Sequence, residues 1–154
     1  MKLNGRFFPF EEDRNENNPE KDFPIEEKVR DFSGKERMFE ITYRDVGLGF
    51  VVDAIEKVKG EGGYFFSVFD STSPYLALGK LRDKMRCALS TRNLYKEGGR
   101  FYPTHDTIQG RITSVDGQVG FVVDGIPLSL EQFAMIAEMH EGWDFTFTIA
   151  DRCE

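Results

Sequence analysis

Two stretches of the chain alternate apolar and polar residues, as a strand does when one of its faces is buried. They are MFEITYRD at 38–45 and DFTFTIAD at 144–151. Between them, GLGFVVDAIEKV at 47–58 and YFFSVFD at 64–70 have the β-branched and aromatic content of strands. The glycine-rich GEGG at 60–63 predicts the turn of a hairpin that joins these two segments. We therefore expect several antiparallel strands, the last of which closes the chain.

Two longer segments have the spacing of three to four residues that is typical of an amphipathic helix. The first spans 75–94, with Ser73 as the expected N-cap. The second spans 129–143, where Ser129 and Gln132 have the spacing of a capping box. The apolar stripe of the first helix consists of Leu78, Leu81, Met85 and Leu89.

A second hairpin is predicted by the dipeptide Asp116-Gly117, which lies between strand-like segments at 107–115 and 118–125. Its return strand contains GFVVDGI, which is nearly identical to GFVVDAI at 49–55 in the first hairpin. A helical pattern follows each hairpin. One interpretation is a duplicated hairpin–helix unit, and the other is a chance match between residues that are common in strands.

These patterns predict an α+β fold in which antiparallel hairpins are each followed by a helix. The result would be two ββα-like halves and a final C-terminal strand. The start of the chain is rich in charge and also contains phenylalanines, which predicts an acidic arm that either packs on its own domain or becomes ordered only on a partner. Within it, PIEEKVRDF at 24–32 predicts one short helix. The expected divisions are the arm at 1–35, a first strand-hairpin-helix half at 36–97, a linker at 98–103 and a second hairpin-helix-strand half at 104–154.

Composition narrows the class of protein. The 154 residues are enough for a hydrophobic core, and 15 phenylalanines against one tryptophan predict an aromatic one. A net charge of −7 argues against general attraction to nucleic acid or anionic lipid. The first residues lack the apolar core of a signal peptide, and no apolar run is long enough to cross a membrane. Two cysteines without a CxxC motif fit a reducing compartment, so we expect a cytoplasmic protein without a cofactor.

The first hairpin suggests one metal site. If GEGG alone forms the turn, Lys59 pairs with Tyr64 and Asp53 lies directly across from Asp70. Opposed carboxylates repel one another unless a metal or a shared proton relieves them. This arrangement would suit a metal-assisted hydrolase. The alternative is that the aspartates cap turns at strand ends, as aspartate commonly does.

A basic patch in the otherwise acidic chain suggests a binding surface. Between residues 80 and 100 there are seven basic residues and only two acidic ones. Residues four apart share a face of the predicted helix. That face would bind an acidic partner, nucleic-acid phosphates or the acidic arm of the chain, unless internal ion pairs occupy it. The residues expected to bind a partner are Lys80, Arg82, Lys84, Arg86 and Arg92.

The stretch from FEITYRD through GEGGYFFSVFDSTSPYLALGKLRDKMRCAL, about 38–92, resembles the small HicB-type antitoxin module. In that family a strand leads into a glycine-containing hairpin, then a strand that ends on an acidic turn, and then an amphipathic helix. The family's proline-glycine turn after the acidic residue is replaced here by STSP. The resemblance implies a partner-binding unit without catalysis, related to an incomplete ribonuclease-H-like fold. The closing EGWDFTFTIADR also resembles the end of uncharacterised bacterial proteins.

The sequence therefore predicts a non-catalytic bacterial binding or regulatory module that uses a basic helix face. Two alternatives stay open, which are a metal-assisted hydrolase with paired Asp53 and Asp70, and a nucleic-acid-binding protein. We expect a protein partner and no membrane contact, and self-association is left open.

Overall fold

The structure is a computed structural model, and it describes residues 17–151. The fold is α+β, with three antiparallel sheets and few helices. The elements are α2 (Pro19–Asp22), β1 (Ile25–Arg30), β2 (Glu36–Asp45), β3 (Phe50–Glu56), β4 (Phe65–Asp70), α3 (Pro74–Leu89), β5 (Leu94–Glu97), β6 (Arg100–Pro103), β7 (Arg111–Val115), β8 (Gln118–Val123), β9 (Ile126–Ser129) and α4 (Leu130–Glu138).

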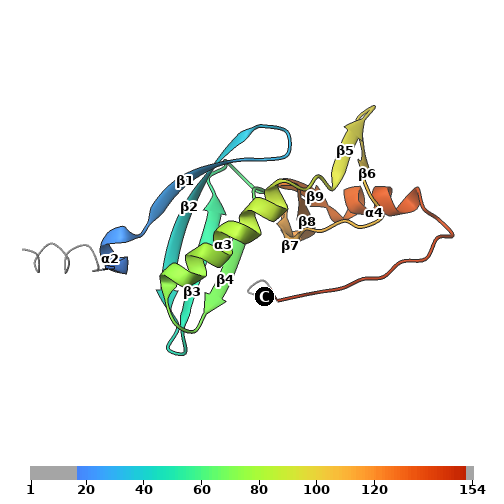
Figure 1. Ribbon diagram of the computed structural model, residues 1–154. Helices are drawn as coiled ribbons and strands as arrows, with labels where there is room; N and C mark the ends of the chain where they lie inside the picture. Colours follow the sequence, from blue (N-terminus) through green and yellow to red (C-terminus); the bar gives the residue numbers. More distant parts are fainter. Residues whose placement is uncertain (1–16, 152–154) are drawn as a thin grey trace, which may run out of the picture.

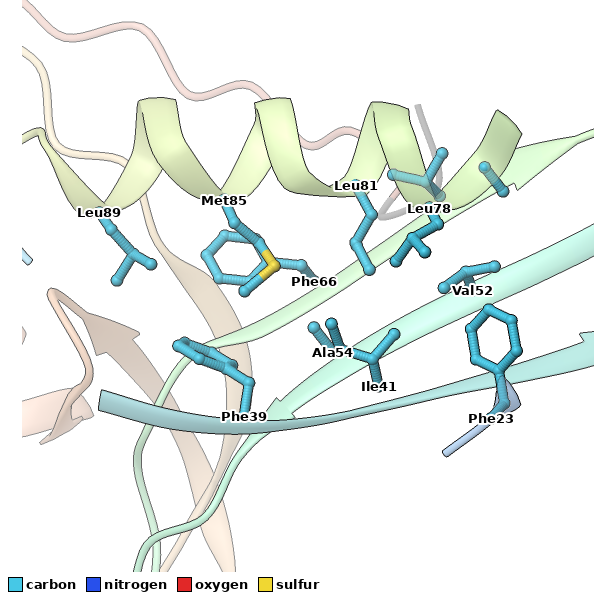
Figure 2. Packing of buried hydrophobic residues seen from close by; sticks show 12 residues of the cluster. Phe23, Phe39, Ile41, Val52, Ala54, Phe66, Leu78, Leu81, Met85 and Leu89 are labelled. Carbon is cyan, nitrogen blue, oxygen red and sulfur yellow. The ribbon is translucent and has the colours of Figure 1, made fainter. Parts of the chain in front are cut away.

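The first sheet has the order β1-β2-β3-β4, and α3 lies across one of its faces (Figure 1). The predicted stripe of α3 is buried in full and points at the sheet, where it meets Phe39, Ile41 and Phe66 (Figure 2). Burying this much apolar surface is the main source of stability for the unit. The buried stripe consists of Leu78, Leu81, Met85 and Leu89.

Both long helices begin where the sequence predicts. The Ser73 hydroxyl accepts a hydrogen bond from the backbone N–H of Tyr75, 3.0 Å away, at the start of α3. Ser129 and Gln132 form the complete capping box of α4. A capped end satisfies backbone donors that a helix otherwise leaves open. None of the helices in the described part of the chain is long and apolar enough to span a membrane.

The segment 24–32, predicted as a short helix, instead forms strand β1. Burial alternates along this strand, with Ile25 and Val29 turned inward and Lys28 and Arg30 turned outward. Apolar residues four apart fit one face of a helix and also one face of a strand, and pairing with β2 decides the outcome. Phe23, just before this strand, is buried in the core against Tyr43.

The second half consists of a three-stranded sheet, β7-β8-β9, with α4 packed against it. Phe121 of β8 stacks on Phe133 of α4 with 4.3 Å between ring centroids. The predicted Asp116-Gly117 hairpin is confirmed, and both residues have the positive φ that such a turn requires. A third strand, β9, was not predicted. Residues 98–103, expected as a linker, contribute β6 and the turn of the β5–β6 ribbon.

The predicted final strand at 144–151 is wrong, because α4 is the last regular element of the described chain. After α4 the chain runs extended and back along the molecule without joining a sheet (Figure 1). Alternation alone does not make a strand, since a strand also needs an edge to pair with.

The two copies of the repeated segment occupy the middle strands of their sheets, β3 and β8. Their aspartates differ in position. Asp53 lies within β3, whereas Asp124 follows β8 in a turn and has a positive φ of 55°. Only the aspartate of the second copy therefore lies at the end of its strand.

Candidate functional site

The predicted basic residues of α3 lie on both flanks of its buried stripe. Lys80, Arg82, Lys84 and Arg86 belong to this helix, and Arg92 follows its C-terminus. The side chains of Lys80 and Arg86 are more than half exposed. The structure therefore divides the predicted cations, because Lys80 and Lys84 reach β4 whereas Arg82 and Arg86 lie on the β1 side of the helix.

Carboxylates of the same chain neutralise much of this charge. Lys80 pairs with Asp70 at 2.7 Å, and Arg86 pairs with Asp83, one turn away, at 2.8 Å. Arg82 reaches across to β1, where its guanidinium lies 2.7 Å from Glu27. Exposed pairs of this kind add little stability, so another acidic group can compete for the cations.

The remaining two cations bond to backbone carbonyls. The Lys84 ammonium donates to the Ser67 carbonyl of β4 at 3.1 Å. The Arg92 guanidinium donates to the Leu94 carbonyl at 2.9 Å and lies over the ring of Phe32. These contacts fix Lys84 and Arg92 more tightly than a freely solvated surface cation.

A shallow hollow of about 240 Å³ lies between β1 and α3, and we call it the basic hollow. Arg82 and Arg86 line it from the helix, and Glu27, Lys28 and Val29 line it from the strand, where the Lys28 side chain is on the outward face. Sequence reasoning missed Lys28, because it had placed that residue on a helix. The basic hollow is lined by Glu27, Lys28, Val29, Arg82, Met85 and Arg86.

Asp53 and Asp70 do not face one another, so the predicted carboxylate pair is wrong in its register. Asp53 pairs with Ser67, and Asp70 pairs with Phe50. The cause is a longer connection than GEGG alone, because Glu56 rather than Lys59 pairs with Tyr64 through a 3.0 Å backbone hydrogen bond.

Asp70 caps the turn into α3. Its carboxylate accepts hydrogen bonds from the backbone N–H groups of Thr72 and Ser73 at 2.9 and 3.0 Å. The hydrogen bond from Lys80 and these two backbone donors lower the pKa of Asp70 to about 2. The turn-capping alternative is therefore the role that this residue has in the fold.

Asp53 has separate partners on the open face of the first sheet. It accepts a 2.5 Å hydrogen bond from the Ser67 hydroxyl, and it lies 3.4 Å from the Arg44 guanidinium. Within residues 17–151 no three histidine, cysteine, aspartate or glutamate side chains are grouped so that they could hold a metal ion. Neither aspartate is therefore placed beside further ligands.

A buried ionic network was missed by the sequence reading. The Arg37 guanidinium donates to Asp31 at 2.8 Å and to both carboxylate oxygens of Glu56 at 3.0 and 3.1 Å. Glu56 also accepts from the backbone N–H of Tyr64, which explains the register of the hairpin. The signal was present, since Glu56 falls on the inward side of β3 with Val52 and Ala54. A buried arginine with two carboxylates is a structural network, because its groups bond to one another.

The two halves meet at Asp124. Its buried carboxylate accepts hydrogen bonds from the backbone N–H groups of Asn93 and Leu94 and from the Asn93 amide, each near 2.9 Å at its shorter contact. The loop between β3 and β4 adds a second contact, since the Gly63 N–H donates to the Gly125 carbonyl at 2.8 Å.

Comparison with known proteins gives two adjoining matches. Residues 21–90 match a family described as Domain of unknown function (DUF7686). Residues 91–154 match a second family, described as Domain of unknown function (DUF7713). The two matched segments adjoin directly after α3. None of the curated proteins matches the chain, and none of the solved structures does.

Proposed function

We propose that the protein is a non-catalytic binding module that holds an acidic partner protein at the basic hollow. The observation that carries this proposal is that Arg82 and Arg86 of α3 line one depression, with Lys28 of β1 at its border. Among the described residues that line it, Glu27 is the only one with a carboxylate. In a chain with a net charge of −7, this is a local reversal of sign.

The lining of the hollow suits a carboxylate-bearing side chain. Val29 and Met85 form apolar walls, along which the aliphatic part of a glutamate would pack. Its carboxylate would take the place of Glu27 on Arg82, or would add a second acceptor to the guanidinium, which has five donors. Arginine binds carboxylates in a two-pronged geometry, which gives orientation as well as attraction.

The resemblance to HicB-type modules supports the same proposal. Strands β2, β3 and β4 followed by α3 have the order of elements that the resemblance implies, and Asp70 forms the acidic turn before the helix. A partner-binding unit of that kind acts without catalysis. We also propose that the protein works in the bacterial cytoplasm, because its two lone cysteines fit a reducing compartment.

The organisation in two halves is a further element of the proposal. Strands β2, β3 and β4 lead into α3, and strands β7, β8 and β9 lead into α4. The repeated segment lies on the middle strand of each series. This supports the duplication of a strand-hairpin-helix unit over a chance match.

Charge reversal tests the proposed surface. A tagged wild-type chain and the double variant R82E/R86E are compared by affinity purification from the native cell and mass spectrometry. We expect an acidic protein to be retained by the wild type and lost by the variant. The matched control is K96E/R100E, which makes the same change in net charge on the β5–β6 ribbon. Retention by R82E/R86E, with circular dichroism showing a folded chain, would contradict the proposal.

Nucleic acid is the first alternative. It predicts salt-dependent retention of the purified protein on immobilised duplex DNA or RNA, because phosphate contacts release counterions. Under the proposal we expect no retention at physiological salt. If the wild type is retained and R82E/R86E is not, the basic hollow would be a nucleic-acid-binding site instead.

The metal-assisted hydrolase is the second alternative. A metal bound at Asp53 or Asp70 would stabilise the folded state and raise its melting temperature. Since these carboxylates bond to Ser67 and Lys80 respectively, we expect Mg²⁺ and Mn²⁺ to leave the melting temperature unchanged. A rise that the D53N variant abolishes would revive the hydrolase.

A further inference from the structure

The segment after α4 exposes a row of large apolar side chains. Trp143, Phe145, Phe147 and Ile149 are 75, 87, 60 and 71% exposed, and polar residues alternate with them. Isolated exposed apolar residues are normal, but a contiguous row of four indicates a surface that another molecule or segment covers. The segment is also extended, with the period of a strand that has one buried face.

A defined turn presents this segment away from its own sheet. The His140 N–H donates to the Ala137 carbonyl, and the Trp143 N–H donates to the His140 carbonyl, both at 2.9 Å. The Trp143 indole packs against the His140 ring with 5.2 Å between centroids. Gly142 takes a φ of 90°, which favours glycine. The segment therefore leaves α4 in a direction set by the turn (Figure 1).

An extended segment of this pattern binds by adding to the edge of a sheet. Three edges of this chain are poor acceptors. The backbone groups of Glu26, Lys28 and Arg30 point toward the free edge of β1. Charged side chains along such an edge oppose pairing with another strand. On β4 the Lys84 ammonium holds the Ser67 carbonyl. The edge of β9 carries a proline, which has no N–H to donate.

The edge of β7 is suited to accept a strand. Val115 and Gln118 flank a two-residue turn, so they form a hydrogen-bonded pair, and Ile112 and Ser114 then direct their backbone groups outward. Ile112 is 50% exposed, and Val119 on the same face is 49% exposed. The β5–β6 ribbon offers only strands of four residues.

A hollow of about 250 Å³ lies where the β7–β8 turn meets the start of α4. Val119 and Leu130 contribute apolar surface to it, and Leu130 is 51% exposed. An added strand whose apolar row faces the α4 side would cover Ile112. The β7 edge and the segment 143–150 would therefore have their apolar side chains on the same face of the extended sheet.

We infer that residues 143–150 of one molecule add as a strand to the β7 edge of a second copy of this chain. The occupant is a second copy because this chain carries both the donor segment and an edge with the matching apolar face. Two copies that exchange their segments reciprocally satisfy both edges and both apolar rows, which closes the assembly as a dimer. The inference is independent of the basic hollow, which lies on the first sheet.

Sedimentation equilibrium and light scattering of the full chain test this inference. We expect a dimer for the wild type, and for the donor variant F145D/F147D a rise in the dissociation constant of about a hundredfold, from the loss of two central aromatic contacts. The acceptor variant I112D should show a similar rise. The control T146E/T148E adds the same charge to the opposite row and should remain a dimer.

Mixing the variants gives a second readout that a folding defect would not reproduce. F145D/F147D keeps a working acceptor edge, and I112D keeps a working donor segment, so the mixture should form a heterodimer through one contact. A monomeric wild type overturns the inference, whether its segment is exposed or folded on its own sheet. A wild-type dimer that survives F145D/F147D overturns it as well.

Discussion

Asn93 and Asp124 are joined across 31 residues of sequence by a 2.9 Å hydrogen bond from the asparagine amide to the carboxylate. The same asparagine accepts from the backbone N–H of Gln109 through its own carbonyl oxygen, at 3.0 Å. Asn93 therefore ties the segment after α3 to both the turn after β8 and the segment just before β7. The contacts with Asp124 are buried, and an unpaired polar group there is costly.

Replacing Asp124 by asparagine should destabilise the chain by about 1–3 kcal/mol, because an amide cannot accept from all the donors that converge there. Asparagine tolerates the positive φ, so the backbone of the turn is retained. The matched control is D116N, in the other Asp-Gly turn, which should stay within about 0.5 kcal/mol of the wild type. Urea denaturation measures both, and an equal effect at the two positions would contradict the role of Asp124.

Asp31 should make the stability of the chain depend on pH at the acid end. Burial raises the pKa of this carboxyl, but hydrogen bonds from Ser33, Arg37 and Lys35 outweigh it and lower the pKa to about 2, from 3.8 in the unfolded chain. A depressed pKa contributes stability that is present above the unfolded value and is lost as the pH falls through the folded value.

We therefore expect Asp31 to contribute about 2 kcal/mol at neutral pH, and this contribution to disappear as the pH falls from about 4 to 2. Denaturation of the wild type and D31N across this range gives the difference between them. The difference should shrink toward acid pH. A difference that stays constant from neutral to acid pH would show that the carboxylate charge does not matter.

Leu81 and Leu76 lie on opposite sides of α3. Replacing each by alanine distinguishes the contribution of core packing from that of helix propensity. Leu81 is fully buried, whereas Leu76 is 54% exposed. L81A should cost about 3 kcal/mol, since it removes buried methyl groups and leaves a cavity under the helix. L76A should change the free energy of unfolding by less than about 0.5 kcal/mol. Similar losses at the two positions would argue against the packing in Figure 2.

Gly79 offers a stabilising substitution. It lies in the middle of α3, and a Cβ at this position would meet nothing within 4 Å. G79A should therefore stabilise the chain by about 0.5–1 kcal/mol, because alanine loses less backbone freedom on folding. Gly120 is the contrast, since its Cβ would lie 2.4 Å from a Val115 methyl group. G120A should destabilise by about 1–3 kcal/mol, and thermal melts of both variants would reveal a reversed order.

The helices were predictable because their determinants are local. Ser73 and Ser129 cap the helices that follow them, and the apolar spacing from Leu78 to Leu89 lies within one element. The Asp116-Gly117 turn was predictable for the same reason, since two adjacent residues specify it.

The errors concern partners that are distant in sequence. The segment 24–32 became a strand through pairing with β2, and 144–151 stayed unpaired because no edge of its own chain holds it. The register of Asp53 depended on Glu56, which Arg37 holds from another strand. Patterns within a segment contain none of this information.

The candidate site was predictable in part. The cations of α3 were found from their spacing, because helical geometry alone places Lys80 with Lys84 on one flank and Arg82 with Arg86 on the other. Their ion pairs with Glu27 and Asp70, and the contribution of Lys28, depend on how β1 and β4 pack on the helix. The charge of the surface that a partner would contact could therefore not be predicted from the sequence.

The length of the loop between β3 and β4 is constrained by contacts in both halves of the chain. It sets the register of the first hairpin through Glu56 and Tyr64, and it reaches the second half, where Glu61 accepts from the Asp116 N–H and Gly63 accepts from Arg111. A solvent-facing hairpin absorbs an inserted or deleted residue without harm. Here a single inserted residue would either slide one sheet or detach the other, so this loop is a poor place to graft a peptide or a tag.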